Sequence, residues 1–257
     1  MEQIFEISGA ETLAKCRRGG AISVLPLDKL ASRGEAEAFQ TAAVRALGGV
    51  PCGYKIGATS VEVQQLLSCQ EPIYSPILSE DVLQSGSTFR IPRGLLGVEC
   101  EFGFVMARDF PASPEALNTT ALRSAIAECF VGLELVGRRV VDDVPLNEVS
   151  AIADFALDVA IIRGKSISDW GNYDLAEMPV RAVLDGVTMV TSNGGMVLGH
   201  PLNALIWLAE TLHKRGSSLR SGEMVLTGTC TGITKVAAGQ TFSGRFADFS
   251  PVQIHFV

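Results

Sequence analysis

The stretch Gly97-Val-Glu-Cys-Glu-Phe-Gly-Phe-Val-Met-Ala107 predicts a long and mostly apolar strand. Residues two apart in a strand point the same way and lie about 6.6 Å apart. Glu99 and Glu101 therefore share a face, which continues with the apolar Val105. Two like charges in such a setting repel each other and resist desolvation unless a cation lies between them. The alternative is a solvated edge on which both charges face water.

Glu134 presents the same difficulty in a second strand. It stands in Phe130–Val136, which is otherwise apolar, so its carboxylate also needs a partner. Three carboxylates from two strands form an all-oxygen site that suits Mg²⁺ or Mn²⁺, with positions open for water and substrate. Zinc fits less well, because no His or Cys stands at ligand spacing to these glutamates. The histidines at 200, 213 and 255 are isolated in sequence, which is more typical of structural than of catalytic residues.

The sequence on both sides of these strands predicts further strands. Apolar runs and alternation mark Cys52–Gly57, Ile73–Leu78, Val98–Met106, Phe155–Ile162 and Val225–Thr229. In the first of these, Lys55 points to the face opposite Tyr54 and Ile56. Two more strands, Val180–Leu184 and Val187–Thr191, flank Asp185-Gly186, a signal for a two-residue hairpin.

Helices are predicted from their start and stop signals. S/T-x-x-E capping boxes are formed by Ser8 with Glu11, Ser32 with Glu35, and Thr59 with Glu62. The second box opens a helix that Gly48-Gly49 ends, and the third opens a short helix through Val61–Leu67. Later helices run through Leu122–Cys129 and from Pro201, at the first helical position, to Lys214-Arg215-Gly216.

Many strands with a few helices among them do not form repeating βα units. We therefore expect an α+β fold built on a mixed, largely antiparallel sheet system. The first part of the chain is the richer in helix. A small helical N-terminal portion over residues 1–70 and a β-rich catalytic domain over residues 71–257 are the expected organisation.

Composition and charge exclude several classes of protein. The chain has 257 residues, 47% of them hydrophobic, and a formal net charge of −7. An acidic chain without a polybasic cluster is not expected to bind nucleic acid or an anionic membrane. The six cysteines show no C-x-x-C spacing, and the N-terminus shows no signal peptide. We expect a soluble cytoplasmic protein with reduced thiols and no membrane span.

Two glycine-rich stretches fail the tests for nucleotide binding. Thr227–Gly232 lacks the G-K-[ST] ending of a P-loop, and Asn193–Gly199 follows a hairpin instead of opening a Rossmann unit. Both still offer unhindered backbone N–H groups and hydroxyls that could hold a carboxylate.

An ordered set of motifs resembles the 2-keto-4-pentenoate hydratase branch of the fumarylacetoacetate hydrolase superfamily. The motifs are GYKIGATS from Gly53, GVECEFGFVM from Gly97, GLELVGRR from Gly132, LGHPLNALIWLAETL from Leu198 and LRSGEMVLTGTCTG from Leu219. The resemblance implies a mixed β-roll or β-sandwich fold. It also implies a divalent metal, Mg²⁺ or Mn²⁺, held by acidic side chains that correspond to Glu99, Glu101 and Glu134.

The resemblance implies further site residues. The lysine of the family's G-x-K-[IV]-G segment falls on Lys55, the expected catalytic proton shuttle. The [ST]-G-[ST] segment, which faces the substrate carboxylate, makes Thr229 and Gly228 the expected substrate-binding residues. Two positions depart from the pattern. Ile73 stands where related hydratases carry an acidic residue, and Phe155, which follows Asp154, stands where they often carry asparagine.

The activity implied by the resemblance is addition of water to a 2-hydroxy-2,4-dienoate, with the metal as Lewis acid. Alternatives are a decarboxylase of a vinylogous 2-oxo acid such as 4-oxalocrotonate, and a diketo-acid C–C hydrolase. The hydrolase branch carries a further lysine near its metal, and Lys165 lacks the sequence pattern that surrounds that lysine. The family also implies homo-oligomers and hydratase–decarboxylase complexes, so a non-catalytic subunit is a further alternative. Retention of all three glutamates and Lys55 argues against that last alternative.

Overall fold

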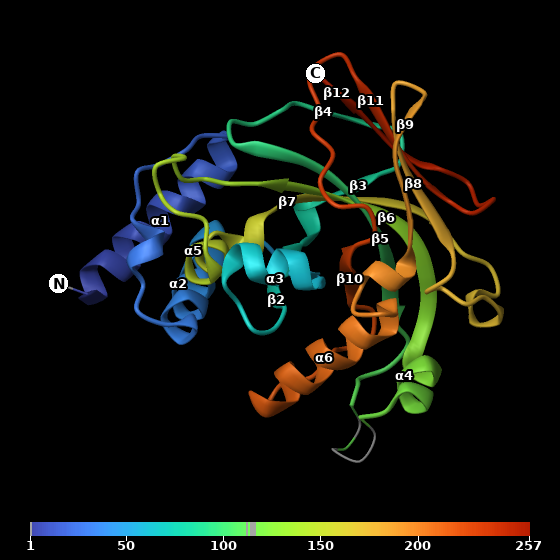
Figure 1. The fold of residues 1–257 in the computed structure, drawn as a ribbon. Helices are drawn as coiled ribbons and strands as arrows, with labels where there is room; N and C mark the ends of the chain where they lie inside the picture. Colours follow the sequence, from blue (N-terminus) through green and yellow to red (C-terminus); the bar gives the residue numbers. More distant parts are fainter. Residues whose placement is uncertain (1, 112, 114–116) are drawn as a thin grey trace.

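The computed structural model describes residues 2–111, 113 and 117–257. Its strands form two mixed sheets (Figure 1). The larger sheet has seven strands in the order β2-β1-β10-β5-β6-β7-β3, and the smaller has five in the order β4-β12-β11-β8-β9. Strand bounds are β1 Pro51–Gly57, β2 Ile73–Leu78, β3 Val82–Gln84, β4 Ser87–Phe89, β5 Leu95–Met106, β6 Ile126–Gly137, β7 Asp158–Ser166, β8 Pro179–Leu184, β9 Val187–Asn193, β10 Met224–Thr229, β11 Thr241–Phe246 and β12 Val252–Phe256.

Six α-helices are found in the described part of the chain. They are α1 Glu2–Gly19, α2 Arg33–Leu47, α3 Val61–Leu67, α4 Thr119–Ala125, α5 Glu148–Ala153 and α6 Pro201–Lys214. Helices α1, α2 and α5 gather beside one end of the larger sheet, whereas α6 lies apart from them near β10 (Figure 1). None of the described helices is long and apolar enough to cross a membrane.

Long antiparallel pairing organises the larger sheet. β5 and β6 have 12 residues each and place Glu99 directly opposite Glu134. Parallel pairing occurs where β1 meets β10, where β3 meets β7 and where β4 meets β12. The expected α+β fold with a mixed, largely antiparallel sheet system is therefore confirmed.

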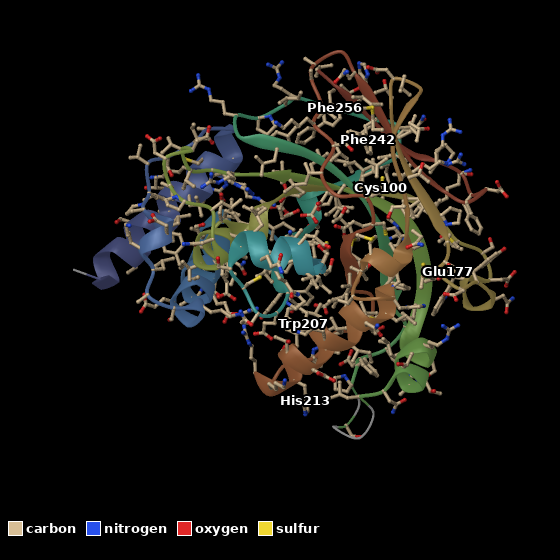
Figure 2. The ribbon with its side chains drawn as sticks, in the orientation of Figure 1. Cys100, Glu177, Trp207, His213, Phe242 and Phe256 are labelled. Carbon is tan, nitrogen blue, oxygen red and sulfur yellow. The ribbon has the colours of Figure 1, made fainter. Side chains whose placement is uncertain are left out.

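Apolar side chains fill the space between the two sheets. Phe242 and Phe256 of the smaller sheet and Cys100 of the larger sheet are fully buried in one core cluster (Figure 2). A second cluster joins α1, α2 and α5 around Phe39 and Phe155. Burial of an aromatic side chain of this size contributes roughly 1.5–3 kcal/mol. The second core thus fixes the helices against the rest of the fold.

Several predicted elements are present with the expected bounds. β1 matches the predicted strand, and β8 and β9 flank Asp185 and Gly186, whose φ angles of +49° and +84° suit the predicted hairpin turn. Ser32 caps α2 by accepting a hydrogen bond from the Glu35 amide. α6 begins at Pro201 as predicted.

Other predicted bounds are wrong. Ser8 lies inside α1, and α3 is capped by Ser60 in place of Thr59. The predicted helix through Leu122–Cys129 ends at Ala125, because β6 continues its pairing with β5 as far as Ile126. The local helix preference of these residues is overridden by strand pairing with a distant part of the chain.

The predicted strand Phe155–Ile162 begins only at Asp158. Residues Phe155–Leu157 form a short 3₁₀ turn with φ angles of +54°, +48° and +69°. Two guanidinium groups stack on the Phe155 ring, with Arg17 at 4.7 Å and Arg139 at 5.2 Å from its centroid. These contacts hold a backbone conformation that costs about 1–2 kcal/mol per residue.

The division at residue 70 stays a prediction. β1, on the N-terminal side of that boundary, pairs with β10 and β2 inside the larger sheet. Helices α1 and α2 pack against each other and against α5.

Candidate active site

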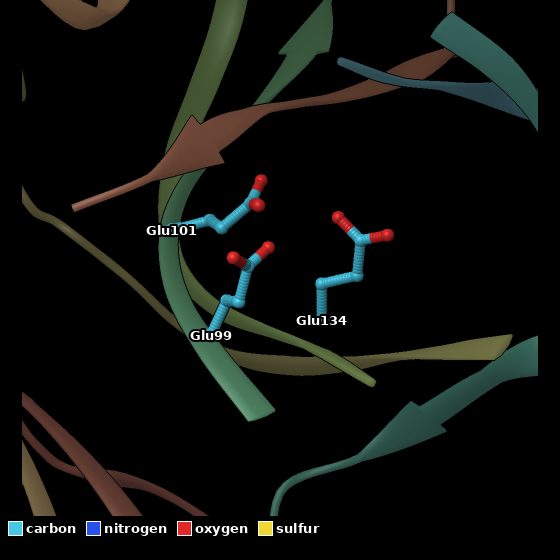
Figure 3. A group of neighbouring side chains, drawn as sticks. All are labelled: Glu99, Glu101 and Glu134. Atoms are coloured by element: carbon cyan, nitrogen blue, oxygen red, sulfur yellow. The ribbon is translucent and has the colours of Figure 1, made fainter. Parts of the chain in front are cut away.

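The three glutamates lie together on neighbouring strands of the larger sheet. Glu99 and Glu101 project from β5 and Glu134 from β6, and their carboxylates converge (Figure 3). One carboxylate oxygen from each residue lies within 4.8 Å of the others. Glu101 and Glu134 are fully buried, whereas Glu99 is partly exposed. The group therefore has one open side, at Glu99.

The surroundings of the carboxylates fit a divalent cation. Glu101 Oε1 and Glu134 Oε2 accept no hydrogen bond from any residue that the structure describes. Burial and the Glu134 charge raise the pKa of Glu99 to about 8, and burial with both neighbouring carboxylates raises that of Glu101 well above its usual range. Buried acceptors without donors and mutually repelling charges are what a hard, oxygen-preferring ion removes.

Lys55 of β1 supplies the one cation in direct contact with the glutamates among the described residues. Its Nζ lies 2.8 Å from Glu134 Oε1, and its side chain is 3% exposed. Burial on its own would lower the Lys55 pKa, but the charges of Glu134 and Asp158 outweigh burial and raise it. The structure thus brings Lys55 to the predicted site, on the strand face opposite the half-buried Tyr54.

Gly228 and Thr229, at the end of β10, also border the glutamates. The Gly228 N–H donates a hydrogen bond of 2.8 Å to Glu101 Oε2. The Thr229 hydroxyl accepts from the Gly232 amide at 2.8 Å and interacts with the Glu99 carboxylate, where it opposes the rise of the Glu99 pKa. Both predicted substrate-binding residues therefore contact the candidate metal ligands.

Backbone conformation at Gly228 makes this arrangement possible. Its φ is +106°, and a Cβ added there would overlap the Thr59 hydroxyl. Thr59 is 3% exposed, and its carbonyl accepts a hydrogen bond from the Leu198 amide at 3.0 Å. The segment after β1, the loop before α6 and the end of β10 therefore meet beside the glutamates.

Asp158 is an electrostatic partner of the site that the sequence analysis missed. Its side chain is fully buried at the start of β7, and Arg17 Nη2 donates to its Oδ2 at 2.6 Å. The Asp158 charge raises the pKa of both Lys55 and Glu134. The signal that points to Glu134, a lone carboxylate beside an apolar strand, is also present at Asp158.

Ile73 and Phe155 are the two positions at which the chain departs from the family pattern. Ile73 is buried in the second core cluster, together with Phe155. Asp154 forms a buried ion pair with Arg139 at 3.2 Å. Asp154 therefore neutralises an arginine, and neither Ile73 nor Phe155 offers a group that can transfer a proton.

The histidines lie in structural positions. His200 caps α6 by accepting from the Leu202 amide, and His255 lies 3.1 Å from the Thr241 hydroxyl across β11 and β12. His213 lies in the last turn of α6 (Figure 2). None of the three belongs to the group of potential metal ligands found in the described residues.

Comparison with known proteins identifies the family. The Fumarylacetoacetate (FAA) hydrolase C-terminal family matches residues 60–255, and the chain belongs to it. A "2-keto-4-pentenoate hydratase" of Paraburkholderia xenovorans (strain LB400) is 32% identical over 217 residues, covering 82% of this chain and 77% of the relative. The "TodF product hydratase" of Pseudomonas putida (strain F1) is 29% identical over 255 residues, covering 96% and 93%.

A solved structure shares the whole fold. The "4-oxalocrotonate decarboxylase from Pseudomonas putida G7 - complexed with magnesium and adipate" superposes with a TM-score of 0.90 at 21% identity, covering 99% of this chain and 98% of that one. The predicted fold class and family are thus confirmed. The chain is an enzyme of this family, and the relatives it resembles are named hydratases, which are hydro-lyases.

Proposed function

We propose that the protein is a divalent-metal-dependent hydratase. Its substrate is a 2-hydroxy-2,4-dienoate such as 2-hydroxypenta-2,4-dienoate, and its product is a 4-hydroxy-2-oxo acid. The observation that carries the proposal is the convergence of three carboxylates beside the buried Lys55 ammonium. Relatives named hydratases support it.

Glu99, Glu101 and Glu134 are the proposed ligands of Mg²⁺ or Mn²⁺. When bound, the metal supplies Lewis-acid stabilisation of the negative charge that develops on the C2 oxygen of the substrate. Glu101 is oriented by the Gly228 amide and Glu99 by the Thr229 hydroxyl. The partly exposed Glu99 leaves one side open, where Thr229 and Gly228 hold the substrate carboxylate in our proposal.

Lys55 is the proposed proton shuttle. Its ammonium is held at Glu134 by a 2.8 Å contact and is shielded from bulk water, so its position is fixed. The ammonium gives a proton to C5 and takes one back from the C2 hydroxyl as the dienoate becomes an enone; the hydroxyl of water then bonds to C4 while its proton goes to C3. A positioned acid–base group of this kind contributes roughly 10²–10⁴-fold to the rate.

A decarboxylase of 4-oxalocrotonate is the second candidate. The decarboxylase fold matches 99% of this chain, and Ile73 removes an acidic side chain that related hydratases carry. Carbon–carbon hydrolysis is less favoured, because the histidines lie in the structural positions described above. We further propose a cytoplasmic homo-oligomer with a related decarboxylase as its candidate partner.

Product analysis tests the proposal and separates the candidates. The protein with Mg²⁺ is incubated with 2-hydroxypenta-2,4-dienoate and, separately, with 4-oxalocrotonate, and the products are identified by mass. Gain of water by the dienoate supports the hydratase, and loss of CO₂ from 4-oxalocrotonate supports the decarboxylase instead. Glu101→Gln should abolish turnover, and the exposed Glu177→Gln is the matched control that should retain it (Figure 2). Failure of both substrates with wild-type protein would overturn the proposal.

A further inference from the structure

A cavity of about 460 Å³ lies away from the glutamates. Three of its walls are the last turn of α1, the segment that leads from β4 into β5, and the end of β6. Residues 80, 81, 83, 159 and 160 complete the lining, and neither the three glutamates nor Lys55 belongs to it. Cavities of this size hold small molecules in proteins. The cavity therefore lies apart from the candidate active site, and its volume suits a small molecule.

Backbone hydrogen bonds join the three walls. The Arg93 amide donates to the Gly20 carbonyl at 3.1 Å, and the Arg138 amide donates to the Gly94 carbonyl at 2.9 Å. Gly94 has a φ of +80°, and a Cβ there would overlap the Arg138 carbonyl. The chain thus closes these segments against one another, and the cavity is built into the fold.

Arginine dominates the lining of this cavity. Six arginines face two acidic residues, Glu80 and Asp81, in a chain whose net charge is −7; the arginines are Arg17, Arg18, Arg90, Arg93, Arg138 and Arg139. Carboxylates neutralise two of them, since Arg17 pairs with the half-buried Asp81 and the buried Asp158 at 2.6 Å and Arg139 with the buried Asp154 at 3.2 Å. Asp154 and Asp158 lie behind the cavity wall. Together with Glu80 and Asp81 they balance four of the six guanidinium charges, so two positive charges remain in excess.

The remaining four arginines have no carboxylate within 4.0 Å among the described residues. Arg90 and Arg93 are exposed and make no described side-chain hydrogen bond, and Arg18 donates to the carbonyls of Ala46 and Leu47. Arg138 is only 9% exposed, and its guanidinium donates only to the Val144 carbonyl in the described structure. Asp154 acts on the Arg138 charge from beyond 4.0 Å, so a bound anion would give this buried guanidinium a direct charged partner.

We propose that this cavity binds a small polyanion with at least two carboxylate or phosphate groups. Guanidinium groups bind both kinds of group through paired, charge-assisted hydrogen bonds. Four guanidiniums without carboxylate partners exceed what a single monovalent group can satisfy. The cavity volume limits the ligand to a small molecule.

Equilibrium binding tests this proposal with two probes, tricarballylate for carboxylates and inorganic pyrophosphate for phosphates. Calorimetry on the full chain should show saturable binding of at least one probe with one site per chain, and the tighter probe identifies the chemical class. Arg90→Gln/Arg93→Gln should weaken that binding by about tenfold or more. Arg181→Gln/Arg245→Gln, exposed arginines of β8 and β11 outside the cavity, makes the same change in net charge and should leave it unchanged.

Each titration is run with Mg²⁺ and again after chelation of metal. Binding to the arginine cavity should persist without the metal. Binding that disappears on chelation would assign the anion to the glutamate site and overturn the proposal. The proposal would also be overturned if neither probe showed saturable binding, or if the two double variants lost affinity equally. Turnover of the Arg90→Gln/Arg93→Gln variant reports on the glutamate site separately, so the two proposals fail independently.

Discussion

The three glutamates have different neighbours, so their replacement has different consequences. Glu101 accepts from a backbone amide, Glu134 contacts Lys55, and Glu99 is partly exposed beside Thr229. Burial is complete for Glu101, and no side-chain cation contacts it in the described structure. Glu101 is therefore the ligand whose charge is least compensated in the metal-free protein.

Glu101→Gln tests this difference. Losing one ligand should weaken Mn²⁺ binding by more than about 100-fold, since even changes behind the ligands cost roughly 10–100-fold. At alkaline pH, where the carboxylates ionise, the metal-free variant should melt at a higher temperature than the metal-free wild type, because like-charge repulsion among buried carboxylates is removed. Metal titration and calorimetry measure both effects, with Glu177→Gln as the control. Unchanged metal affinity would contradict the assignment of Glu101 as a ligand.

Lys55→Met keeps the length of the side chain and removes its charge. Turnover should fall by roughly 10²–10⁴-fold, the usual contribution of a positioned acid–base group. Metal affinity should be retained, because the lost ammonium competes with the cation for Glu134. Turnover and metal titration on the same preparation distinguish the two effects. Near-wild-type turnover would remove Lys55 from the mechanism, and a large loss of metal affinity would assign it a supporting electrostatic role.

Thr229→Val removes a hydroxyl and keeps the shape of the side chain. If the hydroxyl holds the substrate carboxylate, KM should rise more than kcat falls, as expected for binding that is equal in the ground and transition states. Thr229→Ser retains the hydroxyl and should stay close to wild type. Steady-state kinetics on both variants provides the measurement. A fall in kcat at unchanged KM would show that Thr229 acts through Glu99 instead.

At the scale of elements, patterns within one strand were predictable and pairings between strands were not. Alternation predicts β5, and the apolar surroundings of its glutamates predict that they need a cation. The register that sets Glu134 opposite Glu99 depends on residues about 35 positions apart, which no local pattern encodes. Lys55 reaches Glu134 only because β1 joins the sheet beside β10 in parallel.

Element ends were predicted less well for the same reason. Ile126 and Cys129 fit a helical face, yet they belong to β6 because β5 extends far enough to pair with them. The left-handed turn at Phe155–Leu157 depends on Arg17 and Arg139, which stack on Phe155 from other parts of the chain. Tertiary contacts determine the backbone conformation at these positions, so the sequence of each segment taken alone does not predict it.

Gly228→Ala tests how tightly β10 is fitted to the site. The new Cβ would overlap Thr59, at a φ that favours glycine, so both stability and the Glu101 contact should suffer. Gly222→Ala is the matched control, since its φ is +85° and its Cβ would meet no atom within 4 Å. We expect Gly228→Ala to lower the melting temperature and metal affinity much more than Gly222→Ala. Equal effects would mean that backbone strain alone is responsible.

Across the whole molecule, the α-helical layer and the sheet are joined electrostatically behind the site. Arg17 of α1 contacts Asp158 of β7, and Asp158 in turn acts on Lys55 and Glu134. Arg17 therefore compensates Asp158, whereas the glutamates are compensated by Lys55 and, in our proposal, by a metal. Global stability should depend on how many protons or cations the glutamates hold.

The pH dependence of stability tests this link. The pKa of Glu99 is raised from 4.5 to about 8 in the metal-free protein, and those of Glu101 and Glu134 are also raised, first by burial. The folded chain then binds more protons than the unfolded chain between about pH 4.5 and pH 8. These groups stabilise the fold below that window, and their contribution is lost as pH rises through it.

Melting temperatures of metal-free protein from about pH 5 to pH 8 measure this contribution. Glu99→Gln cannot titrate at position 99, so its melting temperature should fall less steeply with pH than that of the wild type. Mg²⁺ at about 100 times its dissociation constant should stabilise the wild type by about 2.7 kcal/mol at any pH at which that ratio holds. At a fixed Mg²⁺ concentration the stabilisation should instead grow with pH, because protons and metal compete for the same oxygens. Parallel slopes for wild type and Glu99→Gln would show that Glu99 is ionised throughout this range.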